Sequence, residues 1–291
     1  MEPVITVGLD ASPESLAAAC WAADEAERRK LTLRLLHAWP TLAPEPTRVA
    51  SEIDHNYWAR RLVDKARAEL QARHPGLVIV GNLVADDAPN ALLQAASESE
   101  MTVLGSRGLD PVGSYFLGDI STPVVARAER PVVLVRAETH KEGPPPAVHT
   151  TGCVVVALKL HGPCDDLLEF AFGTAAAWGV PLRAVHGRSV PPHAHVSLGM
   201  AHDVAEEIIQ DARKQLTQAL RPWCERFPHV EVADSIDLDS PAQAVIRAAA
   251  DAVTLVLGRR KHRPALMPRL GPVAQAALHH VRCPIAVVPH D

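Results

Sequence analysis

The sequence predicts an α/β protein of two tandem domains, each a five-stranded parallel sheet with helices on both faces. Two observations lead to this fold class. The same order of features occurs twice along the 291 residues, and within each copy short β-branched runs alternate with longer helical patterns. Such alternation is typical of β-α-β units, whose strands are continuous apolar runs because helices cover both faces.

The repeat is visible as matching segments at two spacings. Residues 4–10 match residues 153–159 at a spacing of 149, and further along the chain Gly105 matches Gly258 at a spacing of 153. One small insertion in the middle of the second copy accounts for the change in spacing.

A polar segment that ends in three prolines, at 144–146, separates the two copies. Such a run can extend neither a helix nor a central strand. We therefore expect a first domain over residues 1–137, a proline-rich linker over 138–151 and a second domain over 152–291.

Each copy is expected to contain the same elements. The first helix begins with Ser12 as a plausible N-cap, followed by Pro13. Apolar runs predict strands near 3–9, 32–38, 77–84, 101–105 and 131–136, with further helices over 50–73, 88–98 and about 121–128. In the second copy the strands are expected near 153, 182, 230, 253 and 285. Five such strands per copy predict a doubly wound, flavodoxin-like sheet.

Composition excludes several classes of protein. The chain has 34 acidic and 29 basic residues and a net charge of -5, so bulk positive charge for nucleic acid is absent. No apolar run reaches membrane-spanning length, and the acidic first thirty residues do not resemble a secretory signal. Five cysteines without a CxxC pair suit reduced thiols. We expect a cytoplasmic protein that binds neither nucleic acid nor a membrane.

An open parallel sheet binds ligands at the carboxyl ends of its strands where the strand order reverses, here between the first and fourth strands. Glycines there let backbone N–H groups approach phosphates, and a carboxylate can accept hydrogen bonds from ribose hydroxyls or a base amino group. The candidate nucleotide-binding residues follow the first, second and fourth strands and precede the last helix: Gly8, Leu9, Asp10, Ala11, Ala38, Gly105, Ser106, Arg107, Gly108, Gly118, Asp119, Ile120 and Ser121.

These residues resemble the universal stress protein family, whose ATP-binding members carry an Asp after the first strand and a G-x2-G-x9-G-[ST] loop. Gly105, Gly108 and Gly118 match that loop, and the resemblance covers both copies. It implies a fold of the adenine nucleotide alpha hydrolase (HUP) type. It also implies ATP as ligand, with or without Mg²⁺, and a stress-response sensor or regulator that acts through a protein partner.

Asp119 departs from the pattern, which has Ser or Thr at this position. A carboxylate repels triphosphate oxygens unless a divalent cation bridges them. Asp119 is therefore a helix cap, a metal-bridged phosphate contact or a sign that triphosphate binding is lost. The alternatives to an ATP-binding regulator are an interaction scaffold without nucleotide and a cyclic-nucleotide binder.

Known catalytic motifs are missing from the sequence, and no residue is an evident general base. We therefore predict no catalytic residue and at most slow ATP hydrolysis. Histidines at 193, 195 and 202 lack a second ligand pair at recognised spacing, so no metal site is predicted.

The second copy has lost the nucleotide pattern. Lys159 replaces Asp10, Lys261 replaces Gly108, and Pro272 follows the last glycine. Nucleotide binding is not expected in this copy. Its basic loop either holds a different anion or is a solvated surface on a domain kept for pairing.

The last strand of each copy, near 131–136 and 284–289, is an apolar sheet edge that needs covering. Universal stress proteins commonly dimerise through this strand. The resemblance thus implies an intramolecular pseudo-dimer of the two domains, and it leaves a further homodimer open.

Overall fold

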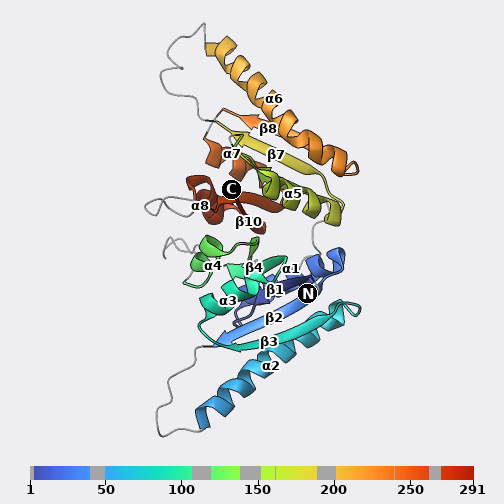
Figure 1. The fold of residues 1–291 in the computed structure, drawn as a ribbon, viewed down its shortest axis with the longest axis vertical. Coiled ribbons are helices and arrows are strands. Elements are labelled where there is room, and N and C mark those ends of the chain that lie inside the picture. Colours follow the sequence, from blue (N-terminus) through green and yellow to red (C-terminus); the bar gives the residue numbers. More distant parts are fainter. Residues whose placement is uncertain are drawn as a thin grey trace. The chain divides into compact units, whose positions relative to one another are not determined.

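The computed structural model describes residues 3–39, 50–106, 119–137, 152–160, 162–188, 201–238, 240–261 and 270–291. The chain divides into two compact units, Met1–Lys141 and Glu142–Asp291. Each is a parallel sheet with helices on both faces, as the sequence predicts (Figure 1). Within the described ranges, no helix combines the length and apolar character needed to span a membrane.

In the first unit the strands lie in the order β3-β2-β1-β4-β5, with parallel neighbours. Helix α1 contacts α2, and α3 contacts α4. With the right-handed crossovers usual for parallel strands, the first pair covers one face of the sheet and the second pair covers the other. The elements are β1 Val4–Gly8, α1 Pro13–Arg29, β2 Thr32–Trp39, α2 Ala50–Arg73, β3 Ile79–Ala85, α3 Ala88–Ser97, β4 Met101–Ser106, α4 Ser121–Arg127 and β5 Val132–Arg136.

The second unit repeats this plan with the strand order β10-β9-β6-β7-β8, again parallel. Its helices α5 and α6 contact each other, as do α7 and α8. The elements are β6 Cys153–Ala157, α5 Asp165–Trp178, β7 Leu182–Gly187, α6 Ala201–Arg226, β8 Val232–Asp237, α7 Pro241–Ala248, β9 Ala252–Arg260, α8 Pro272–His280 and β10 Ile285–His290.

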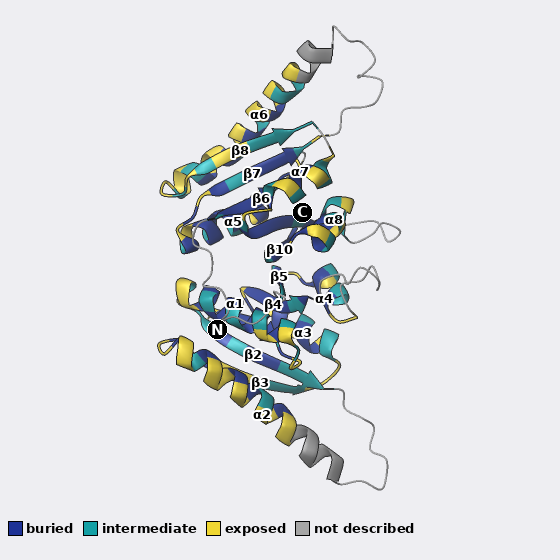
Figure 2. Cartoon of the chain, turned by 180° about the vertical axis from the view of Figure 1, so that it is seen from behind, coloured by how far each residue is buried: buried dark blue, intermediate teal, exposed yellow. Residues whose placement is uncertain are grey.

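The inner strands of each sheet are buried on both faces (Figure 2). In the first unit Ile5, Val7 and Leu33 are completely buried, and so are Ala22 and Ala26 on α1. Alanines let the helix axis approach the sheet closely, so the apolar runs of the sequence are packed from both sides.

Helix α1 starts and ends on local signals. The Ser12 hydroxyl accepts the backbone N–H of Ser15 at 3.1 Å, and Pro13 follows the cap as predicted. At the other end Lys30 has a left-handed φ of 57°, and Gly179 ends α5 with a φ of 65°. The same turn is therefore built with lysine in one unit and glycine in the other.

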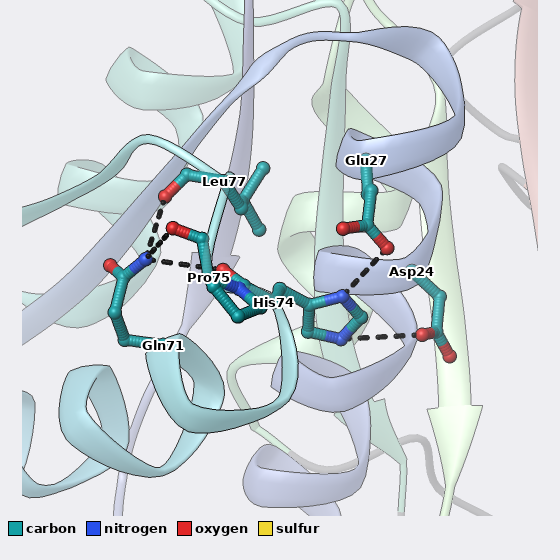
Figure 3. Close-up of polar contacts among 6 residues, drawn as sticks. All are labelled: Asp24, Glu27, Gln71, His74, Pro75 and Leu77. Carbon is teal, nitrogen blue, oxygen red and sulfur yellow. Dashed lines mark hydrogen bonds and ion pairs between the residues drawn. The ribbon is translucent and has the colours of Figure 1, made fainter.

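In the first unit a buried histidine joins the end of α2 to α1 (Figure 3). His74 is only 5% exposed; its Nδ1 lies 2.9 Å from Glu27 Oε2 and its Nε2 lies 3.4 Å from Asp24 Oδ1. The Gln71 side-chain amide donates to the carbonyls of His74, Pro75 and Leu77 at 3.0–3.2 Å. These bonds fix the turn from α2 into β3.

The second unit closes the same helix contact with aromatic rings. Phe227, at the position of His74, has its ring centroid 5.7 Å from that of Phe172 and 6.4 Å from that of Trp223. The Arg226 guanidinium lies 5.3 Å from the Trp223 ring centroid and pairs with Glu169 at 2.9 Å. The α1–α2 contact is thus polar, whereas the α5–α6 contact is aromatic.

Candidate functional site

The loop after β1 is held by bonds from β2. The Leu9 N–H donates to the Leu36 carbonyl at 2.8 Å, and the Leu9 carbonyl lies 2.7 Å from Nδ1 of His37. Since a carbonyl oxygen only accepts, Nδ1 of His37 carries the proton. This bond gives His37 a structural role at the end of β2.

Asp10 stands at the exposed end of this loop. Its Oδ1 accepts the backbone N–H of Ser12 at 2.9 Å and the Ser12 hydroxyl at 2.5 Å. Ala11 between them has a left-handed φ of 67°, which is uncommon for a residue other than glycine. The carboxylate is therefore oriented by the same serine that caps α1.

Gly105, at the end of β4, is required by a close approach of α1. A Cβ there would lie 2.6 Å from the carbonyl carbon of Glu14 and 2.7 Å from the backbone nitrogen of Ser15. Gly105 does not have a left-handed φ, so steric contact and not backbone conformation selects glycine. Gly8 is a milder case, because its Cβ would meet the Leu104 side chain at 3.0 Å.

Between these elements lies a hollow of about 120 Å³ at the carboxyl ends of β1 and β4. Seven predicted residues line it: Gly8, Leu9, Asp10, Ala38, Gly105, Ile120 and Ser121. Leucines and alanines form its apolar part, and Asp10 with nearby serines forms its polar part. An apolar wall with a few polar groups is typical of a small-molecule site.

Sequence reasoning missed several residues that line the hollow: Ser12, Glu14, Ser15, Leu36, Ala88, Leu92 and Leu104. The first turn of α1 could have been included, because a helix that follows the first strand starts at the same edge of the sheet. The leucines carry no such signal, since their pattern is that of ordinary core residues.

Of the other six predicted residues, three are described and do not line the hollow, and three lie outside the described residues. Ala11 and Asp119 are exposed, and Ser106 is buried. Arg107, Gly108 and Gly118 lie outside the described residues.

The interpretation of Asp119 as a helix cap is wrong. The N-cap position of α4 is Ile120, in a helical conformation and without a side-chain capping bond. Asp119 precedes that position, so its carboxylate does not serve the helix terminus. Ser121 instead donates from its hydroxyl to the Gly105 carbonyl at 3.5 Å, which ties α4 to β4.

In the second unit the segments at the matching positions approach the strand ends closely. At the position of Ala38 stands Gly187, where a Cβ would lie 2.5 Å from Cα of Pro241, the first residue of α7. At the position of Gly105 stands Gly258, where a Cβ would lie 2.5 Å from Nε2 of His290. The start of α7 thus lies directly against the end of β7, and the His290 side chain lies against β9.

One basic side chain of this region, Lys261, is engaged within the second unit. Lys261 pairs with Asp166 at 3.1 Å and lies 4.0 Å from Asp291, and its backbone N–H donates to the His290 carbonyl at 2.8 Å. Lys159, at the position of Asp10, is exposed. A hollow of about 260 Å³ in this unit lies at the amino ends of β6 and β7, near Cys153 and Arg183.

The comparisons with known proteins agree with this repeated architecture. The sequence profile of the Universal stress protein family matches residues 2–136 and again 152–289. A universal stress protein of Mycobacterium tuberculosis is 29% identical, over 97% of this chain and 96% of its own. One of Mycolicibacterium smegmatis is 27% identical, over 98% and 96%. The crystal structure of a universal stress protein from Archaeoglobus fulgidus has the same fold, with a TM-score of 0.70, 17% identity and coverage of 99% of this chain and 98% of that one. The chain belongs to the universal stress protein family.

Proposed function

We propose that the first domain binds one adenine nucleotide per chain and that the second domain binds none. The observation that carries this proposal is the hollow between the ends of β1 and β4, with Asp10 at its polar side. It lies where the strand order reverses, which is where open parallel sheets bind their ligands. In the second domain Lys159 stands at the position of Asp10, and Pro241 lies close against Gly187.

The chemistry of the hollow suits a nucleoside. Leu36, Leu92 and Leu104 offer an apolar surface to a planar base, and the Asp10 carboxylate can accept hydrogen bonds from ribose hydroxyls. Glu14 adds a second carboxylate at the start of α1, so a bound triphosphate needs Mg²⁺ to offset the repulsion. The ligand we favour is ATP with Mg²⁺.

A nucleotide bound without an evident general base turns over slowly at most. We therefore assign the chain a regulatory role in the stress response, in the cytoplasm, in which ligand binding changes its affinity for a protein partner. The domain limits of 1–137 and 152–291, the linker between them and the pairing of the two domains through their last strands belong to this proposal.

The first test is to identify any nucleotide released from the purified protein on denaturation, followed by calorimetric titration with ATP and Mg²⁺. Wild type is expected to bind one ATP per chain. Asp10→Ala should weaken binding by about tenfold or more, through the loss of a charge-assisted hydrogen bond. Lys159→Ala, the same position in the second domain, should leave binding unchanged.

Titration with ATP, AMP and cyclic AMP, with and without Mg²⁺, separates the alternatives. Tighter binding of cyclic AMP than of ATP would favour the cyclic-nucleotide function, since one phosphate avoids the repulsion of a triphosphate by carboxylates. No binding of any of the three would favour an interaction scaffold. The observation that favours the scaffold is the exposed Asp119, which stands where ATP-binding members have Ser or Thr.

A further inference from the structure

The outer edge of β3 in the first domain differs from its counterpart, the outer edge of β8 in the second. Each is the terminal strand of its unit, at the end opposite β5 or β10. In the part of the chain that the structure describes, no strand lies beyond either of them. Unpaired strand edges are templates for another strand unless charges or other devices block them.

The backbone groups that face outward on β3 follow from one hydrogen bond. The Leu33 N–H donates to the Val78 carbonyl at 2.9 Å, so Val78 and the even-numbered residues after it point their backbone groups toward β2. Along a strand these groups alternate in direction. The N–H and C=O groups of Ile79, Gly81 and Leu83 therefore face the open edge.

The side chains beside this edge are apolar and exposed on one face. Val78 is 61% exposed and Val80 is 41% exposed. On the opposite face Ile79 is buried, and a Cβ on Gly81 would lie 2.9 Å from the Val63 methyl group of α2. The edge thus combines free backbone groups with an uncovered apolar strip that contains no charged residue between 78 and 84.

We propose that this edge pairs with the same edge of a second copy of the chain, antiparallel and centred on Gly81. In that register Ile79 lies opposite Leu83 of the other copy and Val78 opposite Val84, so apolar side chains meet on both faces. Val80 lies opposite Asn82. The strip is therefore complementary to itself, as a two-fold symmetric interface requires.

The second domain shows how the same edge is blocked. At the positions of Val78, Gly81 and Val84 stand Glu231, Asp234 and Asp237. In the corresponding register Asp234 would face Asp234 of the other copy, and Glu231 would face Asp237. Like charges directly opposite each other destabilise strand pairs. The charges therefore select β3, and not β8, as the edge that can pair with itself.

The test compares the sedimentation of the full chain with that of two matched variants. Wild type is expected to form dimers that dissociate on dilution. Val80→Lys places a charge at an already exposed position, so the fold should survive while dimerisation weakens by about tenfold or more. Ala233→Lys, at the same exposed position of β8, should leave dimerisation unchanged. A wild type that stays monomeric, or dimers that Val80→Lys leaves intact, would overturn the proposal.

A crosslink tests the register independently of stability. Opposed residues of an antiparallel pair have Cβ atoms about 5 Å apart, close enough for a disulfide. A mixture of Val80→Cys and Asn82→Cys chains should therefore form an oxidised dimer, which neither variant forms alone. A dimer without this mixed crosslink would overturn the proposed pairing.

Discussion

In the first domain Ala38 and Ala88 leave the hollow beside β1 open, whereas in the second domain Pro241 lies directly against Gly187 at the matching place. The difference extends to the α2 and α6 ends, where His74 between two carboxylates corresponds to Phe227 in an aromatic cluster. The strands and their register are nearly the same in both units. The strand order and register are therefore kept while the segments that leave the strands, and the side chains of the outermost strand, diverge.

The largest expected effect is a loss of stability that distinguishes the aromatic α5–α6 contact from the polar α1–α2 contact. Phe172 is completely buried and stacks within the aromatic cluster of the second domain. Phe172→Ala should lower the stability of that domain by about 3–5 kcal/mol, because it leaves a cavity. Hydrogen exchange resolved by peptide should show the loss in α5 and α6 and leave α1 and α2 protected. A loss below about 1 kcal/mol would contradict the assignment of this cluster as the core of the contact.

The next effect concerns the glycines at the ends of β4 and β9. Gly105→Ala forces a Cβ into the backbone of α1, so we expect a loss of about 1–3 kcal/mol together with the proposed nucleotide binding. Gly258→Ala meets the ring of His290, which can rotate away, so its cost should be smaller. Urea unfolding of both variants measures the difference. Equal losses of unfolding free energy would contradict this difference between a backbone contact at Gly105 and a side-chain contact at Gly258.

A smaller effect is expected at the helix ends with left-handed φ. The Gly179 Cβ position is open space, so Gly179→Ala should cost about 1 kcal/mol through backbone conformation alone. Lys30→Gly should act in the opposite direction, by up to about 1 kcal/mol, since it removes the strain of a side chain at the same φ. Thermal unfolding should show opposite shifts in the two domains, and shifts of the same sign would contradict this account.

The smallest expected effect is on the alkylation rates of one cysteine thiol in each domain. Burial raises the pKa of Cys20 in the first domain, against the opposing effect of nearby Arg73, and burial likewise raises the pKa of Cys153 in the second. A raised pKa leaves less reactive thiolate at neutral pH, so both should alkylate more slowly than a free cysteine and accelerate only at alkaline pH. Mass spectrometry after timed iodoacetamide treatment measures these rates. Fast labelling at neutral pH would contradict the burial.

The fold was predictable from the sequence because strand and helix periodicities recur at fixed spacings. The position of Asp10 followed from the same reasoning, since residues after β1 must lie at the switch point. The close packing of α7 against β7 was not predictable, because contacts such as Pro241 against Gly187 depend on how closely a helix packs and leave no local signal. The interpretation of Asp119 as a helix cap also failed because it depends on where the helix begins. An aspartate suits a cap, but Ile120 occupies the N-cap position of α4.

One bond is common to both domains although only the first domain carries the nucleotide pattern. Nδ1 of His37 donates to the Leu9 carbonyl at 2.7 Å, and Nδ1 of His186 lies 2.9 Å from the Leu158 carbonyl oxygen. Because this link is also present in the domain that lacks the nucleotide pattern, it belongs to the architecture of the fold. In a duplicated chain each domain serves as a control for the other. Contacts that both domains share stabilise the fold, and features that only one domain has are candidates for a specific function.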